Sequence, residues 1–200
     1  MRILEVVQEM QAGGAERVVL SLAAGAQAVG DSVAIAAAPG PLDEGVHCPR
    51  FELPVIRRRP GAVLAAAWHL ARALRRWRPT LVHCHNPTMA LVTAIATARG
   101  SRVPAVVSVH GVPDEDYARA GRMLRWARLP VVACGPGVAD ALAEHRVDVL
   151  ATIVNGISPA PPPADRRSIM RAWSLPSGRP LIYSVVGLSN QISGAGVFSA

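Results

Sequence analysis

The sequence predicts an α/β protein, a Rossmann-like parallel sheet with helices on both faces. Two observations lead to this prediction. Short, continuous apolar runs alternate over residues 2–156 with longer segments in which apolar residues recur every three or four positions. The apolar runs lack the alternation of polar and apolar residues expected of a half-exposed strand, and this is typical of strands covered on both faces of a parallel sheet.

The elements are expected in the following order. The first strand, "RILEVV", covers 2–7, and a helix follows over 15–29 with Val18, Val19, Leu22, Ala23 and Ala26 on one face. Strands at 32–38 and 51–55 precede a long helix over 61–77, which ends before Pro79. Further strands are expected at 81–85, 105–110, 130–135 and 150–156, separated by helices near 88–99, 116–128 and 137–145.

A change in composition divides the chain. Residues 1–156 are expected to form one Rossmann-like domain, and 157–179 a proline-rich linker with one short helix in "SIMRAW". The segment 180–200 opens with the strand-like "PLIYSVVG" and then loses its pattern. Because one strand alone cannot bury its faces, we expect 180–200 to be the remnant of a second domain's start. A frameshift, a truncation and a genuine terminus remain open.

Composition excludes several classes of protein. All 21 basic residues are arginine, and the absence of lysine excludes a Schiff-base enzyme and a Walker-type phosphate loop. Cys48, Cys84 and Cys134 show neither zinc-site spacing nor a disulfide framework, so reduced, mostly buried thiols are expected. Acidic residues interrupt the apolar N-terminal segment, and no apolar run approaches the ~18 residues of a membrane span. These features favour a cytoplasmic protein.

Polar and glycine residues follow the predicted strands. Ligands bind at the carboxyl ends of strands in doubly wound sheets, so these residues are expected to line a cleft. They are Gly13-Gly14, His85-Asn86, His110-Gly111, Gly135 and Asn155-Gly156. Two interpretations of Gly13-Gly14 stay open: a tight turn that needs no Cβ, or backbone N–H groups that approach an anion at a helix N-terminus.

The sequence predicts neither a cofactor nor a bound metal. A dinucleotide site needs G-x-G-x-x-G after the first strand and an acid closing the second, and both are missing. His83 and His85, two residues apart on one strand, could hold a metal, but the sequence offers no third ligand. We expect His85 to face the cleft and His83 to lie deeper.

The segments "GGAERV", "LVHCHN", "VVSVHG", "VVACGPGVADAL" and "IVNGIS", in this order, resemble the N-terminal domain of the family 4 retaining glycosyltransferases of GT-B fold. "GRPLIYSVVG" resembles the first strand of that family's donor-binding C-terminal domain. The resemblance covers about residues 1–187. It implies transfer of a sugar from a nucleotide-sugar donor to a sugar or lipid-linked acceptor, without a metal. The acceptor would be held mainly by the N-terminal domain, and the chain would be truncated early in the C-terminal domain.

The resemblance also assigns residues. His110 matches a histidine that lies beside the transferred sugar, where it would orient a hydroxyl or stabilise developing charge. The alternative is an ordinary hydrogen-bonded residue at a strand end. The substrate-binding residues implied are Gly13, Gly14, Arg17, His85, Asn86, Gly111, Gly135, Asn155 and Gly156. Ser158 stands near the place of a usual aspartate, so Asn155-Gly156 could also be only a turn.

The function expected is therefore that of a hexosyltransferase in envelope glycolipid or polysaccharide synthesis. The chain alone is expected to be inactive, because no arginine or lysine follows Arg179 and no glutamate pair for the donor occurs before Ala200. The alternative is a non-catalytic Rossmann-like binding module with membrane or protein partners.

Arginines concentrate in one acid-free region. No aspartate or glutamate occurs over 53–113, whereas Arg72, Arg75 and Arg76 lie on one helix opposite its apolar stripe. With Trp68 and Trp77 at an interface, this pattern suits docking on an anionic membrane surface, on the inner face of the membrane. A merely solvated helix face is the alternative. Nucleic acid is not expected as a partner, because no groove-reading motif or aromatic platform accompanies the charge.

Overall fold

A computed structural model of the chain describes residues 1–56, 61–98, 103–156 and 165–175. Two predicted segments lie outside the described residues: the strand at 180–187 and residues 157–164 of the linker. The chain divides into two compact units, Met1–Gly156 and Ile157–Ala200.

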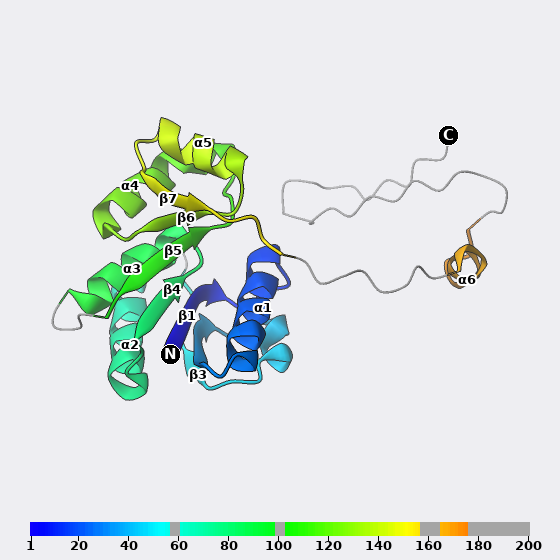
Figure 1. Cartoon of the computed structure of the whole chain (residues 1–200), viewed down its shortest axis with the longest axis horizontal. Helices are drawn as coiled ribbons and strands as arrows, with labels where there is room; N and C mark the ends of the chain where they lie inside the picture. The colour runs from blue at the N-terminus through cyan, green and yellow to red at the C-terminus, as the bar shows by residue number, and fades with distance from the viewer. Residues whose placement is uncertain (57–60, 99–102, 157–164, 176–200) are drawn as a thin grey trace. The chain divides into compact units, whose positions relative to one another are not determined.

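The first unit is built on a seven-stranded parallel sheet with strand order β3-β2-β1-β4-β5-β6-β7 (Figure 1). Every neighbouring pair of strands is parallel, which confirms the predicted Rossmann-like fold class. The strands are β1 (Arg2–Glu9), β2 (Ser32–Ala38), β3 (Arg50–Glu52), β4 (Leu81–Cys84), β5 (Ala105–Val109), β6 (Val131–Ala133) and β7 (Val149–Thr152).

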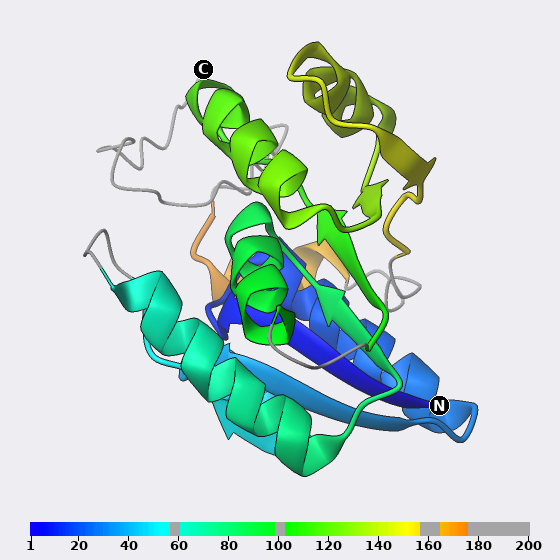
Figure 2. The same cartoon turned by 90° about the vertical axis from the view of Figure 1, so that its left-hand side faces the viewer.

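Helices cover both faces of this sheet, as predicted. They are α1 (Gly14–Ala28), α2 (Ala62–Trp77), α3 (Pro87–Thr97), α4 (Tyr117–Ala127) and α5 (Pro136–Glu144), with the 3-10 turns η1 (Pro41–Gly45) and η2 (Asp114–Asp116). Among the described residues α1 lies on one face, and α2, α3 and α4 pack side by side on the other (Figures 1 and 2). Leu142 of α5 joins the same core as α2, α3 and α4.

Two cores result, one on each face of the sheet. Successive residues of a strand point to opposite faces, so Leu4 and Val6 of β1 join the larger core under α2–α5, whereas Val7 joins the smaller core under α1. Glu5 lies on the α1 face as well, between these apolar residues, and it is only 2% exposed. A buried carboxylate in an apolar strand requires partners.

The topology places a switch point between β1 and β4. From β1 the chain runs outward through β2 and β3, and it then returns to β4 on the other side of β1. A crevice forms where strand order reverses, at the carboxyl ends of the strands. Glu5 of β1 is the register partner of His83 in β4, so the polar residues of both strands meet at this point.

Some predicted details of the fold were wrong. Leu22 was placed on the buried face of the first helix, but it is 41% exposed, while Val19 and Ala23 carry the packing. Trp77 does not lie at an exposed interface: its ring packs against Phe51, with 6.3 Å between centroids, and under the Arg2 guanidinium at 4.2 Å. All three cysteines are free as expected, but only Cys84 is buried.

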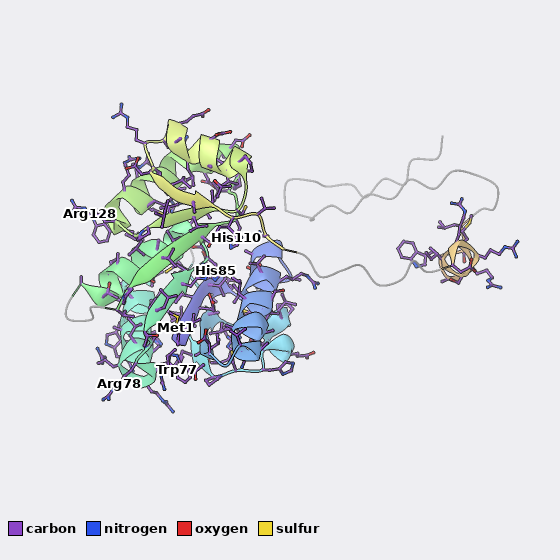
Figure 3. The ribbon with its side chains drawn as sticks, viewed as in Figure 1. Met1, Trp77, Arg78, His85, His110 and Arg128 are labelled. Carbon is purple, nitrogen blue, oxygen red and sulfur yellow. The ribbon has the colours of Figure 1, made fainter. Side chains whose placement is uncertain are left out.

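The backbone requires glycine at one loop position and carries an unusual residue at two helix ends. A Cβ on Gly40 would lie 2.3 Å from the carbonyl oxygen of Met10, so this close approach of two loops requires glycine. Helices α2 and α4 end instead at arginines, Arg78 and Arg128, with φ of 49° and 54° (Figure 3). These left-handed caps are usually glycine, because a Cβ is strained there.

The second unit contains a helix where a short one was predicted. It is α6 (Arg166–Ala172), and the side chain of Asp165 caps its first turn by accepting a hydrogen bond from the Ser168 amide at 3.3 Å. Across the described ranges, no helix combines the length and the apolar character that crossing a bilayer would need.

Candidate functional site

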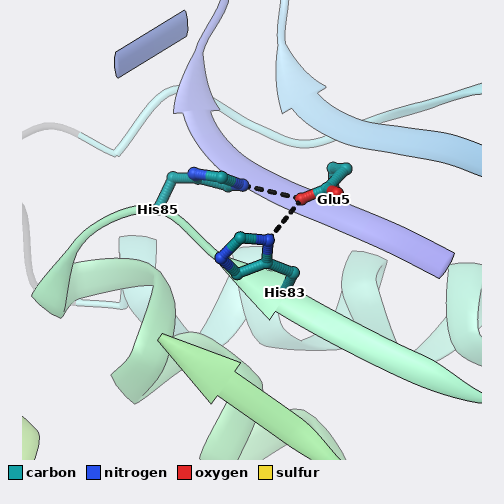
Figure 4. Close-up of side chains that lie close together, drawn as sticks. All are labelled: Glu5, His83 and His85. Carbon is teal, nitrogen blue, oxygen red and sulfur yellow. Dashed lines mark hydrogen bonds and ion pairs between the residues drawn. The ribbon is translucent and has the colours of Figure 1, made fainter. Parts of the chain in front are cut away.

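A buried cluster of Glu5, His83 and His85 occupies the switch point (Figure 4). One carboxylate oxygen, Oε2 of Glu5, lies 2.7 Å from Nε2 of His85 and 3.1 Å from Nδ1 of His83. The two rings lie side by side, with 4.2 Å between their centroids. The parallel register of β1 and β4 therefore brings together residues about 80 positions apart in the sequence.

Hydrogen bonds extend this cluster to the ends of β5 and β7. Nδ1 of His85 lies 3.1 Å from Nε2 of His110, and the two rings are stacked. Figure 3 shows His85 and His110 close together at one edge of the sheet. On the far side of His110, Nδ1 lies 3.4 Å from Nδ2 of Asn155. A second branch of the network starts at His83, whose Nε2 lies 2.8 Å from Oγ of Ser108.

The carboxyl group of Glu5 is ionised across the ordinary pH range. Burial alone would raise its pKa, but the hydrogen bonds from His83 and His85 and the electrostatic attraction of both rings outweigh burial and lower the pKa from 4.5 to about 2. The cluster therefore holds one fixed negative charge inside the protein.

Two histidines of the network, His85 and His110, are neutral near pH 7. Burial lowers the pKa of His85 below its ordinary 6.5, against the opposing effect of the hydrogen bond that His85 donates to Glu5. Burial, together with repulsion from His85 and His83, lowers the pKa of His110 to about 4. A neutral imidazole has one N–H donor and one bare acceptor nitrogen. His110 therefore meets a ligand as a neutral ring that can accept a hydrogen bond.

An open pocket of about 390 Å³ lies against this network, on the α1 face of the sheet. Its polar lining includes His83, Ser108, His110 and Asn155, and its apolar lining includes Leu22 and Val132. The volume lies within the ~300–1,000 Å³ usual for small-molecule sites. Apolar walls with a few convergent polar groups at strand ends are the arrangement that binds and orients a small polar ligand.

The structure reverses the predicted positions of two histidines. We expected His85 to face the cleft and His83 to lie deeper, but His85 is 1% exposed and His83 lines the pocket. The reason is that β4 ends at Cys84, so the His85 ring, just beyond the strand, turns inward to the carboxylate of Glu5. His85 reaches the pocket only through its hydrogen bond to His110.

The paired glycines are not required by the backbone. Gly13 is the extended N-cap of α1, and neither Gly13 nor Gly14 has a positive φ. A Cβ on Gly14 would meet nothing within 4 Å, and one on Gly13 would meet only the flexible carboxylate of Glu16. The interpretation as a turn that excludes side chains is therefore wrong for Gly14. Open space lies above the helix N-terminus, and Arg17 is exposed one turn along.

The remaining predicted residues have identifiable local roles. Asn86 is the N-cap of α3, and its Oδ1 accepts a hydrogen bond from the Met89 amide at 2.8 Å. Gly111 has φ of 90°, a conformation that glycine alone adopts without strain. Gly135 is the extended N-cap of α5. Asn155 and Gly156 follow β7, are exposed and line the pocket.

Sequence reasoning missed Glu5, the centre of the network. The third ligand that the sequence did not offer to His83 and His85 is this carboxylate, since the ligand atoms of Glu5, His83 and His85 all lie within 4.8 Å of one another. Such a set could hold a transition metal. Each of these atoms already makes a hydrogen bond within the cluster, so a metal would have to displace two N–H protons. An acid inside an apolar strand was the signal that could have found Glu5.

The arginine patch of α2, formed by Arg72, Arg75 and Arg76, is exposed. With His69 and Glu52 it lines an open hollow of about 450 Å³. The guanidinium of Arg72 lies 4.8 Å above the ring of Trp68, which is 56% exposed. Of the two tryptophans predicted to flank this patch, only Trp68 stands at the surface.

Solved structures of glycosyltransferases share this fold. A glycosyltransferase from Rickettsia africae ESF-5 is 19% identical, with a TM-score of 0.63 over 90% of this chain and 51% of that one. Anabaena Alr3699/HepE, in complex with UDP and glucose, is 19% identical, with a TM-score of 0.64 over 86% of this chain and 50% of that one. The lipopolysaccharide outer core galactosyltransferase WaaB is 13% identical, with a TM-score of 0.66 over 83% and 50% of the two chains.

The chain thus spans about half the length of these solved structures. At this level of identity the likeness concerns the fold, which matches the GT-B glycosyltransferases. No curated protein matches the sequence. The profile of Glycosyltransferase Family 4 matches residues 12–161, which include every polar residue of the network except Glu5. The chain therefore belongs to Glycosyltransferase Family 4.

Proposed function

We propose that this chain provides the acceptor-side half of a retaining glycosyltransferase that moves a sugar from a nucleotide-sugar donor to a sugar or lipid-linked acceptor. The observation that carries the proposal is the pocket in which His110 and Asn155 meet at the carboxyl edge of a family 4 fold. In support, the similar fold of Alr3699/HepE has been solved with UDP and glucose bound.

In such a transfer, the bond between the anomeric carbon and the donor diphosphate breaks. A new bond forms from that carbon to an acceptor hydroxyl oxygen, whose proton is released. His110 is the catalytic residue proposed here: its neutral ring would accept a hydrogen bond from a sugar hydroxyl and so orient the reacting sugar. Of the two roles predicted for His110, orienting a hydroxyl suits a neutral ring, since the pKa of about 4 leaves a bare acceptor nitrogen at neutral pH.

The departing diphosphate needs cationic or dipolar stabilisation in the transition state. Within the described residues, the free N–H groups at the N-terminus of α1 and the exposed Arg17 are the groups we assign to that side of the reaction. We propose that a donor-binding half supplies the rest, and that this chain alone does not transfer sugar. Here 157–179 would act as the linker and 180–200 as the start of that half.

The test is a transfer assay with radiolabelled UDP-sugars and simple glycoside acceptors. The chain is assayed alone and after addition of a separately expressed donor-binding half from a family 4 enzyme. We expect no transfer by the chain alone and measurable transfer, with retained anomeric configuration, from the mixture. Binding of the two halves without any transfer would favour the non-catalytic binding module. Transfer by the chain alone would contradict the proposal that a donor-binding half is required.

We further propose that the arginine patch docks the protein on an anionic membrane, which would suit an envelope glycolipid or polysaccharide acceptor. Three exposed guanidinium groups beside an exposed tryptophan support this, since basic residues near a surface each add about 1 kcal/mol of attraction. The inner face of the membrane would then be the site of action of a cytoplasmic enzyme.

This second proposal is tested by sedimentation with phosphatidylglycerol vesicles at low salt. Replacing Arg72, Arg75 and Arg76 by glutamine should abolish the sedimentation. The matched control replaces by glutamine three exposed arginines of α4 and its C-cap, Arg119, Arg122 and Arg128, which removes the same charge elsewhere. Equal losses in both triple variants, or no sedimentation of the wild type, would leave the patch as a solvated helix face.

A further inference from the structure

The proton positions in the buried network follow from its carboxylate. An ionised carboxylate only accepts hydrogen bonds, so Oε2 of Glu5 accepts from Nε2–H of His85 at 2.7 Å and from Nδ1–H of His83 at 3.1 Å. The neutral ring of His85 thereby carries its single proton on Nε2. Its other nitrogen, Nδ1, must then be a bare acceptor.

The assignment passes from His85 to His110. Since Nδ1 of His85 is bare, the 3.1 Å contact with Nε2 of His110 is a hydrogen bond only if Nε2 of His110 carries the proton. Nδ1 of His110 is then the bare nitrogen, and the amide of Asn155 donates to it at 3.4 Å. In the second branch, the Ser108 hydroxyl oxygen lies within hydrogen-bond distance of Nε2 of His83, at 2.8 Å.

Every contact of the network has one donor and one acceptor in this arrangement. We propose that Glu5 and His85 are positioning residues for His110, which fix its proton on the inward Nε2 and leave Nδ1 as its acceptor, and that a sugar hydroxyl in the pocket takes the place of the exposed Asn155 amide as donor to this nitrogen. The assignment of the proton rests on the hydrogen bonds and on the ionised carboxylate of Glu5, whereas the sugar hydroxyl as its ligand rests on the proposed function.

A purely structural role explains the network poorly. Burying a charged group costs free energy that apolar residues would not, and replacing buried ionic groups by apolar residues is often neutral or stabilising. Val7, the next β1 residue on the same face, shows that the α1 face accepts apolar side chains. A bound metal would also change which ring nitrogens carry protons, because His83 and His85 would then ligate through the nitrogens that face Glu5.

The experiment is nuclear magnetic resonance of the full chain labelled with ¹⁵N in its histidine rings. Long-range proton–nitrogen spectra report which ring nitrogen carries the proton. For the wild type we expect His110 with the proton on Nε2 only, and protected Nε2–H resonances for both His85 and His110. A proton on Nδ1 of His110, averaged ring signals or a stoichiometric bound transition metal would overturn the proposal.

The informative variant is Glu5→Gln, which keeps the shape but offers an amide that can donate as well as accept. We expect loss of the single protonation state of His110 and loss of its protected N–H resonance. The control is Thr93→Val, which removes a buried hydrogen bond to Cys84 without touching the histidines and should leave the His110 signals unchanged. Unchanged His110 signals in folded Glu5→Gln would overturn the proposal.

A second variant covers the case in which Glu5→Gln does not fold. Asn155 is exposed, so Asn155→Ala should fold, and the proton of His110 should stay on Nε2 because Glu5 determines it. A move of that proton to Nδ1 in Asn155→Ala would overturn the proposal, because the exposed Asn155, and not the buried carboxylate of Glu5, would then determine which nitrogen of His110 is protonated.

Turnover of the mixed halves separates this proposal from the proposed function. Where transfer is measurable, Glu5→Gln should lower kcat with little change in KM, as expected for a group that acts through His110. An unchanged kcat would remove the positioning role. If no transfer occurs but the ring signals are as expected, the proposed function fails and the proton assignment stands.

Discussion

The two faces of the sheet share the same strands but differ in composition. Both have an apolar core, and only the α1 face also has the buried polar network among the described residues. Under α2–α5 the strands contribute a continuous apolar core, to which Leu4 and Val6 belong. Under α1 and beside it, the same strands contribute Glu5, His83 and Ser108, joined by hydrogen bonds. Leu4 and Glu5 are neighbours in the chain and are both buried, yet one is held by packing and the other by polar partners.

The difference indicates how stability and chemistry are divided in this domain. An apolar core gains free energy in proportion to the area it buries. A buried polar network must first recover the cost of desolvation, and it mainly fixes geometry and proton positions. We therefore expect substitutions in the apolar core under α2–α5 to change stability, and substitutions in the network of Glu5, His83 and Ser108 to change the chemistry of His110.

The largest expected effect on stability comes from Leu4→Ala. Leu4 is fully buried in the larger core, so its truncation leaves a cavity and should lower the free energy of unfolding by about 3 kcal/mol. Urea denaturation followed by circular dichroism measures this loss. The ¹⁵N signals of His85 and His110 should stay as in the wild type, and altered ring signals would show that the two faces are not separable.

Acid should destabilise the protein through the α1 face. Glu5, His85 and His110 all have lowered pKa values in the folded chain, so the unfolded chain binds protons at higher pH than the folded one. The stability they provide is complete above about pH 6.5. It falls as the pH drops toward the folded value of about 4 for His110, and then toward about 2 for Glu5.

Urea denaturation at a series of pH values tests this dependence. Leu4→Ala should lower the whole curve without changing its shape. Glu5→Gln should flatten the part below about pH 4.5. A curve of the same shape in Glu5→Gln would mean that the acid sensitivity arises elsewhere in the chain.

A smaller effect on stability is expected from Gly14→Val, at the rim of the α1 face. No atom lies within 4 Å of the added Cβ, so the free energy of unfolding should change by less than about 1 kcal/mol. Binding of UDP-glucose or acceptor by the mixed halves, measured by calorimetry, should weaken far more. Wild-type affinity in the folded variant would show that Gly13-Gly14 only connects β1 to α1 and takes no part in ligand binding.

The smallest effect is expected on the α2–α5 side, at the end of α2. Arg78 caps this helix with φ of 49°, so Arg78→Gly should relieve strain and raise the free energy of unfolding by about 0.5 kcal/mol. Thermal denaturation at high salt, where loss of the charge matters least, measures the gain. A loss of stability would indicate that the arginine side chain contributes contacts that outweigh the strain.

Local patterns in the sequence were enough to predict the fold. The apolar runs located all seven strands, and Pro79 and the strand ends located the helices to within a few residues. The short turn η1 was missed, and β3, β6 and β7 are shorter than the apolar runs that predicted them. Exposure of Leu22 also escaped prediction, since periodicity cannot show that this side chain lines an open pocket.

The site was predicted only in part, for a physical reason. Glycine and polar residues at strand ends are local signals, and His110, Asn155 and Gly156 do line the pocket. The network behind them depends on the register between β1 and β4, which pairs Glu5 with His83. Register is a long-range property that no short segment encodes, so Glu5 was not recognised as a partner and His85 was placed at the surface.

The most direct test compares His110→Ala with Leu4→Ala in the transfer assay of the mixed halves, with rates corrected for the folded fraction of each variant. We expect His110→Ala to slow transfer by about 100-fold or more while its free energy of unfolding stays near that of the wild type. Leu4→Ala should transfer at nearly the wild-type rate per folded molecule. Equal rates for the two variants, or an unchanged rate for His110→Ala, would contradict the division between a stabilising face and a chemical one.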